Sequence, residues 1–246
     1  MNLTIIIPAF NEEKVIIKTL EDLRKNVKIP HKILVVDGCS TDNTYKVIKD
    51  YNLKNKNVNV ILTKLKDRRF ASSIKVGFDR VKAGAVVVVM ADLCDDPKTI
   101  NLMYKKILAG FDVVCGSRYI QGGGKDGGPI LQNYLSRFIC LSLHLLVGIP
   151  TTDVSNAFKM YRKTILKNVR VNPISGVEGS MEIFLQVYYF NNPKVVEVPT
   201  KWQGRTVGQS KFKLLQRTPR YLRIYTWALE NSIRKYLGFN LKKFNS

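Results

Sequence analysis

Three apolar runs that each end near a carboxylate constrain the fold of this chain more than any other feature. The runs and the acids that follow them are residues 3–8 with Glu12, 33–36 with Asp37, and 86–90 with Asp92. Near-continuous Val, Ile and Leu runs predict strands of a parallel sheet covered on both faces. Ligands bind at the carboxyl ends of such strands. The three acids therefore predict one polar site, suited to a nucleotide with or without a metal ion.

Strand-like and helix-like patterns alternate along the first 120 residues. Strands are expected at residues 3–7, 32–37, 58–63, 85–91 and 111–116. Apolar positions at helical spacing predict helices at 12–26, 42–51, 70–82 and 97–109. This alternation predicts an α/β fold with a mostly parallel, Rossmann-like sheet flanked by helices.

The pattern changes after Arg118. The glycine-rich segment 122–129 is expected to form a mobile lid over the site or an ordinary disordered linker. An apolar helix is expected at 130–147, and residues 151–161 and 176–199 should return to the sheet region as strand and helix. No dinucleotide-binding glycine fingerprint follows the first strand, and no P-loop motif is present.

The chain is strongly basic, and its last 46 residues carry much of the charge. The formal net charge is +21, and residues 201–246 hold 11 Lys and Arg against one Glu. This excess favours a phosphate-bearing partner or a solvated basic surface. Nucleic acid is excluded as a partner because no RNP1, helix-turn-helix or zinc pattern is present. Residues 217–237 predict a basic amphipathic helix, with Trp227 on its basic face, that binds an anionic membrane surface or packs on the domain.

The cysteines and the apolar segments bear on location. The four cysteines form no CxxC pair, so a reduced, cytoplasmic compartment is expected. The best candidate for a membrane span, residues 138–149, covers 12 residues and contains His144, whereas a span needs about 20. We therefore expect a peripheral protein at the inner, cytoplasmic face of a membrane, which reaches its lipid directly or through a membrane-anchoring partner protein.

Together the acidic motifs resemble those of the family 2 glycosyltransferases with the GT-A fold. The motifs are Pro8-Ala-Phe-Asn11-Glu12, Asp37-Gly-Cys-Ser-Thr-Asp42 and Ala91-Asp92 through Pro97. Within that family the chain is similar to the dolichol-phosphate mannose synthase branch, which transfers a sugar from a nucleotide to a polyprenyl phosphate. Later motifs that support the branch are Gly116-Ser-Arg118-Tyr119, Leu135-Ser-Arg137 and Thr152-Asp153 through Lys159.

The resemblance implies a role for each matching position. The nucleotide-sugar site would be lined by Pro8, Asn11, Glu12, Asp37, Asp92, Arg205 and Lys211. Asp92 would hold a divalent metal, Mg²⁺ or Mn²⁺, on the donor diphosphate. Arg118 and Arg137 would bind the acceptor phosphate, and Glu182 would be an acid near the sugar. Residues 1–205 would form the catalytic domain, and 206–246 a basic C-terminal segment.

One departure from the family pattern affects the metal. Met90 stands where the family has the first acid of its Asp-x-Asp motif, and Cys94 replaces a polar residue. A thioether is a poor ligand for Mg²⁺, which prefers oxygen. Asp92 would then serve alone, or with Asp95, and metal binding would be weak or dispensable.

The expected chemistry is a single inverting displacement on a nucleotide sugar, such as GDP-mannose or a UDP-hexose. A phosphate acceptor is already anionic, so it needs cations rather than a general base. A soluble or cell-surface hydroxyl acceptor would need a carboxylate base, and Asp95 or Glu182 could supply one. A nucleotide-binding pseudoenzyme is the remaining alternative, because of Met90.

Overall fold

The computed structural model describes residues 1–54, 58–62, 70–167, 169–172, 175–205 and 214–244. In the first half the elements are β1 (Leu3–Ala9), α1 (Ile16–Asn26), β2 (His31–Asp37), α2 (Thr44–Lys54), β3 (Val58–Leu62), α3 (Phe70–Arg80), β4 (Ala85–Val88), α4 (Lys98–Leu108) and β5 (Val113–Ser117). In the second half they are β6 (Gly124–Asp126), α5 (Ile130–Val147), β7 (Lys159–Arg162), the 3-10 turn η1 (Lys163–Leu166), α6 (Gly179–Asn191), β8 (Val195–Pro199), β9 (Lys201–Gln203) and α7 (Leu214–Tyr236). The expected alternation of strands and helices is confirmed.

The central sheet of the described chain has seven strands in the order β3-β2-β1-β4-β7-β5-β8. All neighbours run parallel except β7, which is antiparallel to both β4 and β5. The three strands that end near a carboxylate are adjacent, with β1 between β2 and β4. Ala9 at the end of β1 lies opposite Asp37 at the end of β2. Their carboxyl ends therefore meet at one edge, as the sequence predicts.

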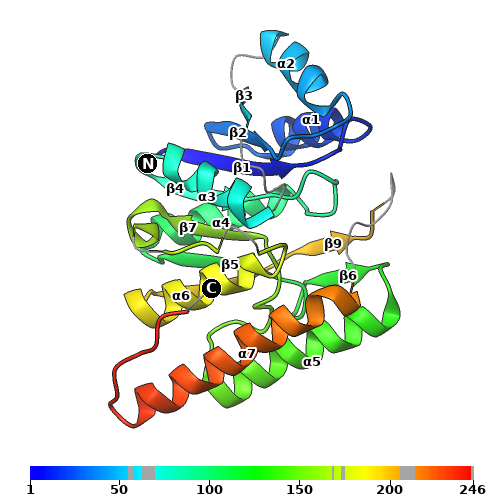
Figure 1. The fold of residues 1–246 in the computed structure, drawn as a ribbon. Helices are drawn as coiled ribbons and strands as arrows, with labels where there is room; N and C mark the ends of the chain where they lie inside the picture. The colour runs from blue at the N-terminus through cyan, green and yellow to red at the C-terminus, as the bar shows by residue number, and fades with distance from the viewer. Residues whose placement is uncertain (55–57, 63–69, 168, 173–174, 206–213, 245–246) are drawn as a thin grey trace.

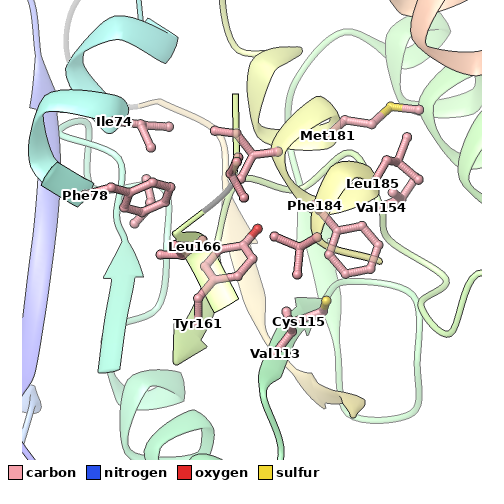
Figure 2. Close-up of a cluster of buried hydrophobic side chains, with 14 of the residues drawn as sticks. Ile74, Phe78, Val113, Cys115, Val154, Tyr161, Leu166, Met181, Phe184 and Leu185 are labelled. Atoms are coloured by element: carbon pink, nitrogen blue, oxygen red, sulfur yellow. The ribbon is translucent and has the colours of Figure 1, made fainter. Parts of the chain in front are cut away.

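The apolar runs are continuous because both faces of the sheet are covered. Ile5 and Ile7 of β1 belong to the core that includes α1 and α4, whereas Ile6 belongs to the core that includes α3 and α6. Side chains alternate between the faces of a strand, so a strand buried on both sides needs an apolar residue at every position. Figure 2 shows the second core, where Phe184 of α6 lies near Val113 and Cys115 of β5.

The glycine-rich segment forms an ordered strand and not a disordered linker. Residues 124–126 make β6, which pairs in parallel with β9 in a separate two-stranded ribbon. Gly123 follows a tight turn, and a Cβ at that position would come within 2.6 Å of the Ser117 carbonyl oxygen. The alternative of a disordered linker is therefore wrong for residues 124–126, because main-chain pairing with β9 holds them in a strand.

The helices α5 and α7 lie side by side below the sheet (Figure 1). In the described part of the chain, α5 is the one helix long and apolar enough to span a membrane by length and composition, and 17% of it is buried. It is longer than the 12-residue stretch weighed from the sequence because the helix continues through Ser136 and Arg137. By contrast, α7 places Ile224, Trp227 and Ala228 in the core shared with α6.

Candidate active site

The loops after β1 and β2 hold each other in place. The backbone N–H of Asn11 donates to the Ser40 hydroxyl at 2.9 Å, and the Thr41 N–H donates to the Asn11 side-chain oxygen at 2.8 Å. Asn11 has a φ of 53°, a left-handed conformation that asparagine tolerates better than most residues. Asp37 is fully buried and accepts hydrogen bonds from the N–H and hydroxyl of Ser40. The loops after β1 and β2 are therefore preformed.

Glu12 and Asp92 meet at the sheet edge through Arg205. The Nη2 atom of Arg205 is 2.8 Å from Glu12 Oε1 and 3.3 Å from Asp92 Oδ2. The exposed fractions of the three side chains are 15%, 8% and 14%. Three predicted site residues from the segments after β1, β4 and β9 are thus brought together. Pro8, at the end of β1, lies opposite Val36 of β2 in the same sheet edge.

Among the described residues, both carboxylate oxygens of Asp92 and one of Asp95 already accept hydrogen bonds. Asp92 Oδ1 accepts a hydrogen bond from the Cys94 N–H at 3.3 Å, and the Cys94 thiol is buried. Asp95 Oδ2 accepts the N–H of Met90 at 3.0 Å. Burial raises the pKa of the Asp95 carboxyl to about 7, although that hydrogen bond acts in the other direction.

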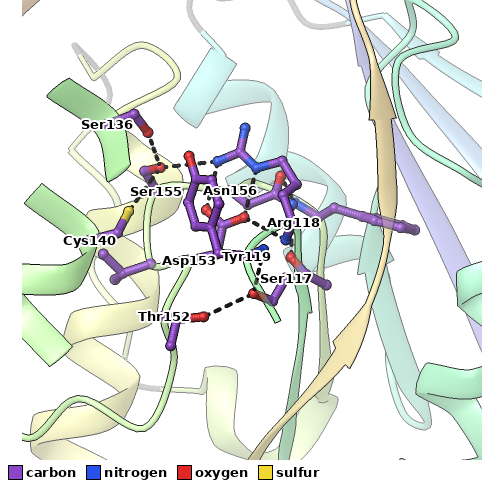
Figure 3. Close-up of polar contacts among 12 residues, drawn as sticks. Ser117, Arg118, Tyr119, Ser136, Cys140, Thr152, Asp153, Ser155 and Asn156 are labelled. Carbon is purple, nitrogen blue, oxygen red and sulfur yellow. Dashed lines mark hydrogen bonds and ion pairs between the residues drawn. The ribbon is translucent and has the colours of Figure 1, made fainter. Parts of the chain in front are cut away.

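Arg118 is held by Asp153 in a buried ion pair (Figure 3). Its Nε and Nη2 donate to the two carboxylate oxygens at 2.7 and 2.6 Å, and Nη2 also lies 3.3 Å from the Ser155 hydroxyl. Ser155 in turn shares a hydrogen bond with Ser136 of α5 at 2.9 Å. The forked pair fixes the guanidinium plane, so within the described chain Nη1 is the nitrogen left to bind an anion.

Buried polar contacts fix the loop that carries Asp153. Glu197 of β8 accepts hydrogen bonds from the Thr151 hydroxyl and the Thr152 N–H at 2.7 and 2.8 Å. The fully buried ammonium of Lys159 donates to the Val154 and Asn156 carbonyls. These contacts give the polar side chains of this segment a structural role, since they hold the loop of Asp153 beside Arg118.

Two further cations lie near Arg118. The guanidinium carbons of Arg118 and Arg137 are 5.3 and 5.6 Å from the centre of the same Tyr119 ring. Lys125 of β6 lies over the Trp202 ring at 5.1 Å. Burial, followed by the charge of Arg118, lowers the pKa of Lys125 to about 8. We call Arg118, Arg137 and Lys125 the acceptor cluster, after the role that the sequence predicts for the two arginines.

Sequence reasoning missed Lys125 and Asp153. Lys125 lies inside the glycine-rich segment, where a lysine is usually a solvated loop residue. Asp153 was visible as part of a motif, but nothing in its spacing identified Arg118, 35 positions earlier, as its partner. Lys125 is placed by the pairing of β6 with β9, and no pattern in the sequence predicts that pairing.

Glu182 lies apart from both clusters. It is in the first turn of α6, is buried, and accepts hydrogen bonds from the Ser175 hydroxyl at 3.0 Å and the Gln186 amide at 3.2 Å. Burial raises the pKa of the Glu182 carboxyl to about 7. The contacts that the structure describes for Glu182 include none to Asp92 or Arg118, so its role near the sugar stays a prediction. Lys211 and the neighbouring Ser210 lie outside the described residues.

Comparison with known proteins assigns the family. Residues 4–170 match the model of Glycosyl transferase family 2. The chain belongs to this family. A dolichol-phosphate mannosyltransferase of Pyrococcus furiosus is 30% identical over 222 residues, which cover 87% of this chain and 60% of the relative. A polyprenol monophosphomannose synthase of Mycolicibacterium smegmatis is 24% identical over 238 residues, which cover 95% of this chain and 89% of the relative. The resemblance to family 2 is confirmed. The chain spans about 60% of the length of the first of these two relatives.

A solved relative confirms the GT-A-like fold of this family 2 chain. Glucosyl-3-phosphoglycerate synthase from Mycobacterium tuberculosis, in complex with UDP, superposes with a TM-score of 0.68 at 14% identity, covering 93% of this chain and 80% of that one. Its complex with Mn²⁺, UDP and glucosyl-3-phosphoglycerate gives a TM-score of 0.64 at 13% identity, with coverages of 97% and 81%. A GT-A fold can thus hold a divalent metal.

The donor atoms of this family 2 chain fit such a metal poorly. Within the described residues, no three His, Cys, Asp or Glu side chains gather where they could hold a metal ion. Asp92 has a hydrogen-bond donor on each carboxylate oxygen, and the neighbouring side chain of Met90 offers sulfur instead of oxygen. Mg²⁺ and Mn²⁺ prefer oxygen ligands. A metal at this site therefore stays a prediction, and the chemistry below uses the protein's own groups.

Proposed function

We propose that this chain transfers a hexose from a nucleotide sugar to a polyprenyl phosphate, with inversion at the anomeric carbon. The observation that carries the proposal is the position of the acceptor cluster beside the exposed apolar face of α5. Arg137 lies on α5, and Ser136 of α5 contacts the loop that holds Arg118. The same helix exposes the large apolar side chains Ile130, Leu131, Tyr134, Leu135, Phe138, Leu141, Leu145 and Leu146.

The donor would bind at the edge formed by β2, β1 and β4. The loops of Asn11 and Asp37 are preformed there, and a rigid site reduces the entropic cost of binding. Arg205 lies at the same edge on Glu12 and Asp92. A guanidinium is suited to the diphosphate because its planar fork matches phosphate oxygens. The sugar would then extend from this edge toward the acceptor cluster.

Transfer needs one bond broken and one formed. An oxygen of the acceptor phosphate attacks the anomeric carbon as the bond to the diphosphate oxygen breaks, and the electron pair leaves with the diphosphate. No proton moves, because a phosphate oxygen is already anionic at neutral pH. The protein has to hold two anions together, and the charges of Arg118, Arg137 and Lys125 offset their repulsion.

The same geometry favours a peripheral position at the cytoplasmic face of a membrane. In a bilayer the lipid phosphate lies at the level of the headgroups, and its chain lies in the hydrocarbon. An in-plane α5 would bury its apolar face in that boundary while Arg137 stays at the phosphate level. The four cysteines are free, which agrees with a reducing compartment. A membrane-anchoring partner protein would be a second route to the lipid.

A hydroxyl acceptor is the second candidate, and one observation favours it. Asp95 lies next to the donor edge with a pKa of about 7. A carboxylate with that pKa suits a general base at neutral pH. This candidate leaves the acceptor cluster and the apolar face of α5 without a role, so we rank it below the polyprenyl phosphate.

A transfer assay tests the proposal. Radiolabelled GDP-mannose, UDP-glucose and UDP-N-acetylglucosamine are each incubated with the protein and a polyprenyl phosphate, and label in the organic phase is counted. One donor should give label in the lipid, and Arg137→Ala should reduce it by about 10²-fold or more. Arg234→Ala, which removes an arginine from the far end of α7, is the matched control. Nucleotide binding without lipid label would contradict the proposal and favour a soluble acceptor or a pseudoenzyme.

A further inference from the structure

The acidic pair at the donor edge already has a cation, and that cation belongs to the protein. Arg205 Nη2 lies within hydrogen-bond distance of both Glu12 and Asp92, at 2.8 and 3.3 Å. All three side chains are at most 15% exposed, so water screens their charges only partly. A second cation at the same carboxylates would have to displace or repel this guanidinium.

In the part of the chain that the structure describes, the side chains next to Asp92 are poor ligands for a metal ion. The side chain of Met90 ends in a thioether, and the Cys94 thiol is buried against the Asp92 carbonyl at 3.7 Å. The Asp95 carboxylate is buried and accepts the Met90 N–H. One carboxylate with both oxygens hydrogen-bonded is a weak anchor for an ion that usually takes one or two free carboxylates together with phosphates.

We propose that Arg205 is the resident cation of the donor site and that sugar transfer needs no divalent metal. Its Nη2 stays on Glu12 and Asp92, while Nε and Nη1, which make no hydrogen bond within the described residues, donate to the diphosphate. The guanidinium then offsets the charge that develops on the diphosphate oxygen as the bond to the sugar breaks. This inference rests on the proposed function.

Metal binding tests the inference without any turnover. Free Mn²⁺ is titrated by electron paramagnetic resonance in the presence of the protein and saturating GDP or UDP. The native protein should bind Mn²⁺ no more tightly than the nucleotide alone does. Met90→Asp combined with Arg205→Met should bind it more than about tenfold more tightly, because even outer-shell partners change metal affinity by about 10- to 100-fold. A stoichiometric, tight Mn²⁺ site in the native protein would overturn the inference.

Activity provides the second test. Transfer by the native protein should be equal in EDTA and in Mg²⁺ or Mn²⁺. Arg205→Met should reduce transfer by about 10²- to 10³-fold, as loss of one charge-stabilising donor does in other enzymes. Arg234→Met makes the same chemical change far from the donor edge and should transfer normally. Thermal melts of each variant establish that the fold is intact.

The two proposals fail in different ways. If EDTA abolishes transfer and Mn²⁺ restores it, the metal-free inference is wrong and the proposed function stands. If no donor supports lipid transfer under any condition, the proposed function is wrong, and the Mn²⁺ titration still decides whether Arg205 occupies the cation position.

Discussion

The two long helices α5 and α7 lie side by side (Figure 1), yet their surfaces differ in chemical character. Five Lys and Arg residues lie in α7, whereas α5 has one arginine and eight exposed large apolar side chains. From the sequence, α7 was expected either to bind an anionic membrane surface or to pack on the domain. The structure shows α7 tied to the domain through charge and aromatic packing, and α5 with its apolar face uncovered.

Trp227 shows why the helices differ. In the membrane-binding alternative, Trp227 was an interfacial residue on the basic face of α7, and its burial shows that this prediction was wrong. It is 6% exposed, its ring packs edge-on against Tyr189 and Phe244, and its Nε1 donates to the Lys242 carbonyl at 2.8 Å. Arg217 pairs with Glu178 of the segment before α6. A basic face can therefore meet buried carboxylates and rings as well as lipid.

The largest expected effect concerns stability and compares two aromatic residues. Trp227→Ala should lower the free energy of unfolding by about 3–5 kcal/mol, because it removes a buried ring from the core. Phe138→Ala, on the exposed face of α5, should change it by less than about 0.5 kcal/mol. Urea unfolding followed by circular dichroism measures both. Equal losses would mean that α5 is packed as firmly as α7.

The second effect concerns membrane binding and compares two exposed aliphatic residues. Leu145→Glu on α5 should weaken binding to phosphatidylserine-containing vesicles by about 10- to 100-fold, because an apolar side chain no longer leaves water. Ile233→Glu on α7 should weaken it less than about threefold, since the exposed apolar neighbours of Ile233, which are Tyr236, Leu237 and Phe239, form a smaller group than the apolar face of α5. Vesicle sedimentation gives the partition coefficients. A larger loss for Ile233→Glu would make α7 the membrane helix.

The third effect tests how charge holds α7. Glu178 is buried and pairs with Arg217 at 2.8 Å and with Arg220 at 3.3 Å. Glu178→Gln should lower the free energy of unfolding at pH 7.5 by about 1–2 kcal/mol, a modest value because the arginines are partly exposed. Thermal melts against pH measure the difference between variant and native protein.

The pH dependence of that difference follows from the pKa of Glu178. Burial alone would raise this pKa, but the Gly176 N–H and Arg217 outweigh burial and lower it below the usual value. Its contribution is therefore complete above the ordinary glutamate pKa and is lost as the pH falls through the lower pKa of the folded state. The two proteins should converge at acidic pH, and a difference that persists there would exclude the ion pair as its cause.

The smallest effect concerns Lys125, the member of the acceptor cluster that lies on β6. With its pKa lowered to about 8, the free ammonium loses its proton as the pH rises from 7 to 9. Transfer efficiency, kcat/KM for the polyprenyl phosphate, should fall severalfold over that range, since kcat/KM reports the free enzyme. Lys125→Arg should keep the profile flat. A profile that falls equally in Lys125→Arg would assign the titration to another group.

Much of the fold could be predicted because its signals are local. Consecutive apolar residues such as Ile5, Ile6 and Ile7 can be buried together only in a strand covered on both faces. The carboxylates that follow β1, β2 and β4 could then be placed at one edge, since the carboxyl ends of adjacent parallel strands meet. The family motifs identified the same residues independently.

The sequence by itself determined the order of elements, the three strands that end near a carboxylate, and the family. The tertiary structure alone decided which charges meet. Arg205 reaches Glu12 across 193 positions and Asp92 across 113, and Arg118 reaches Asp153 across 35. It also decided that Trp227 is buried and that β7 runs antiparallel between β4 and β5. The physical reason is that periodicity and caps act over a few residues, whereas ion pairs and strand pairing depend on which distant segments the packed core brings within a few ångströms.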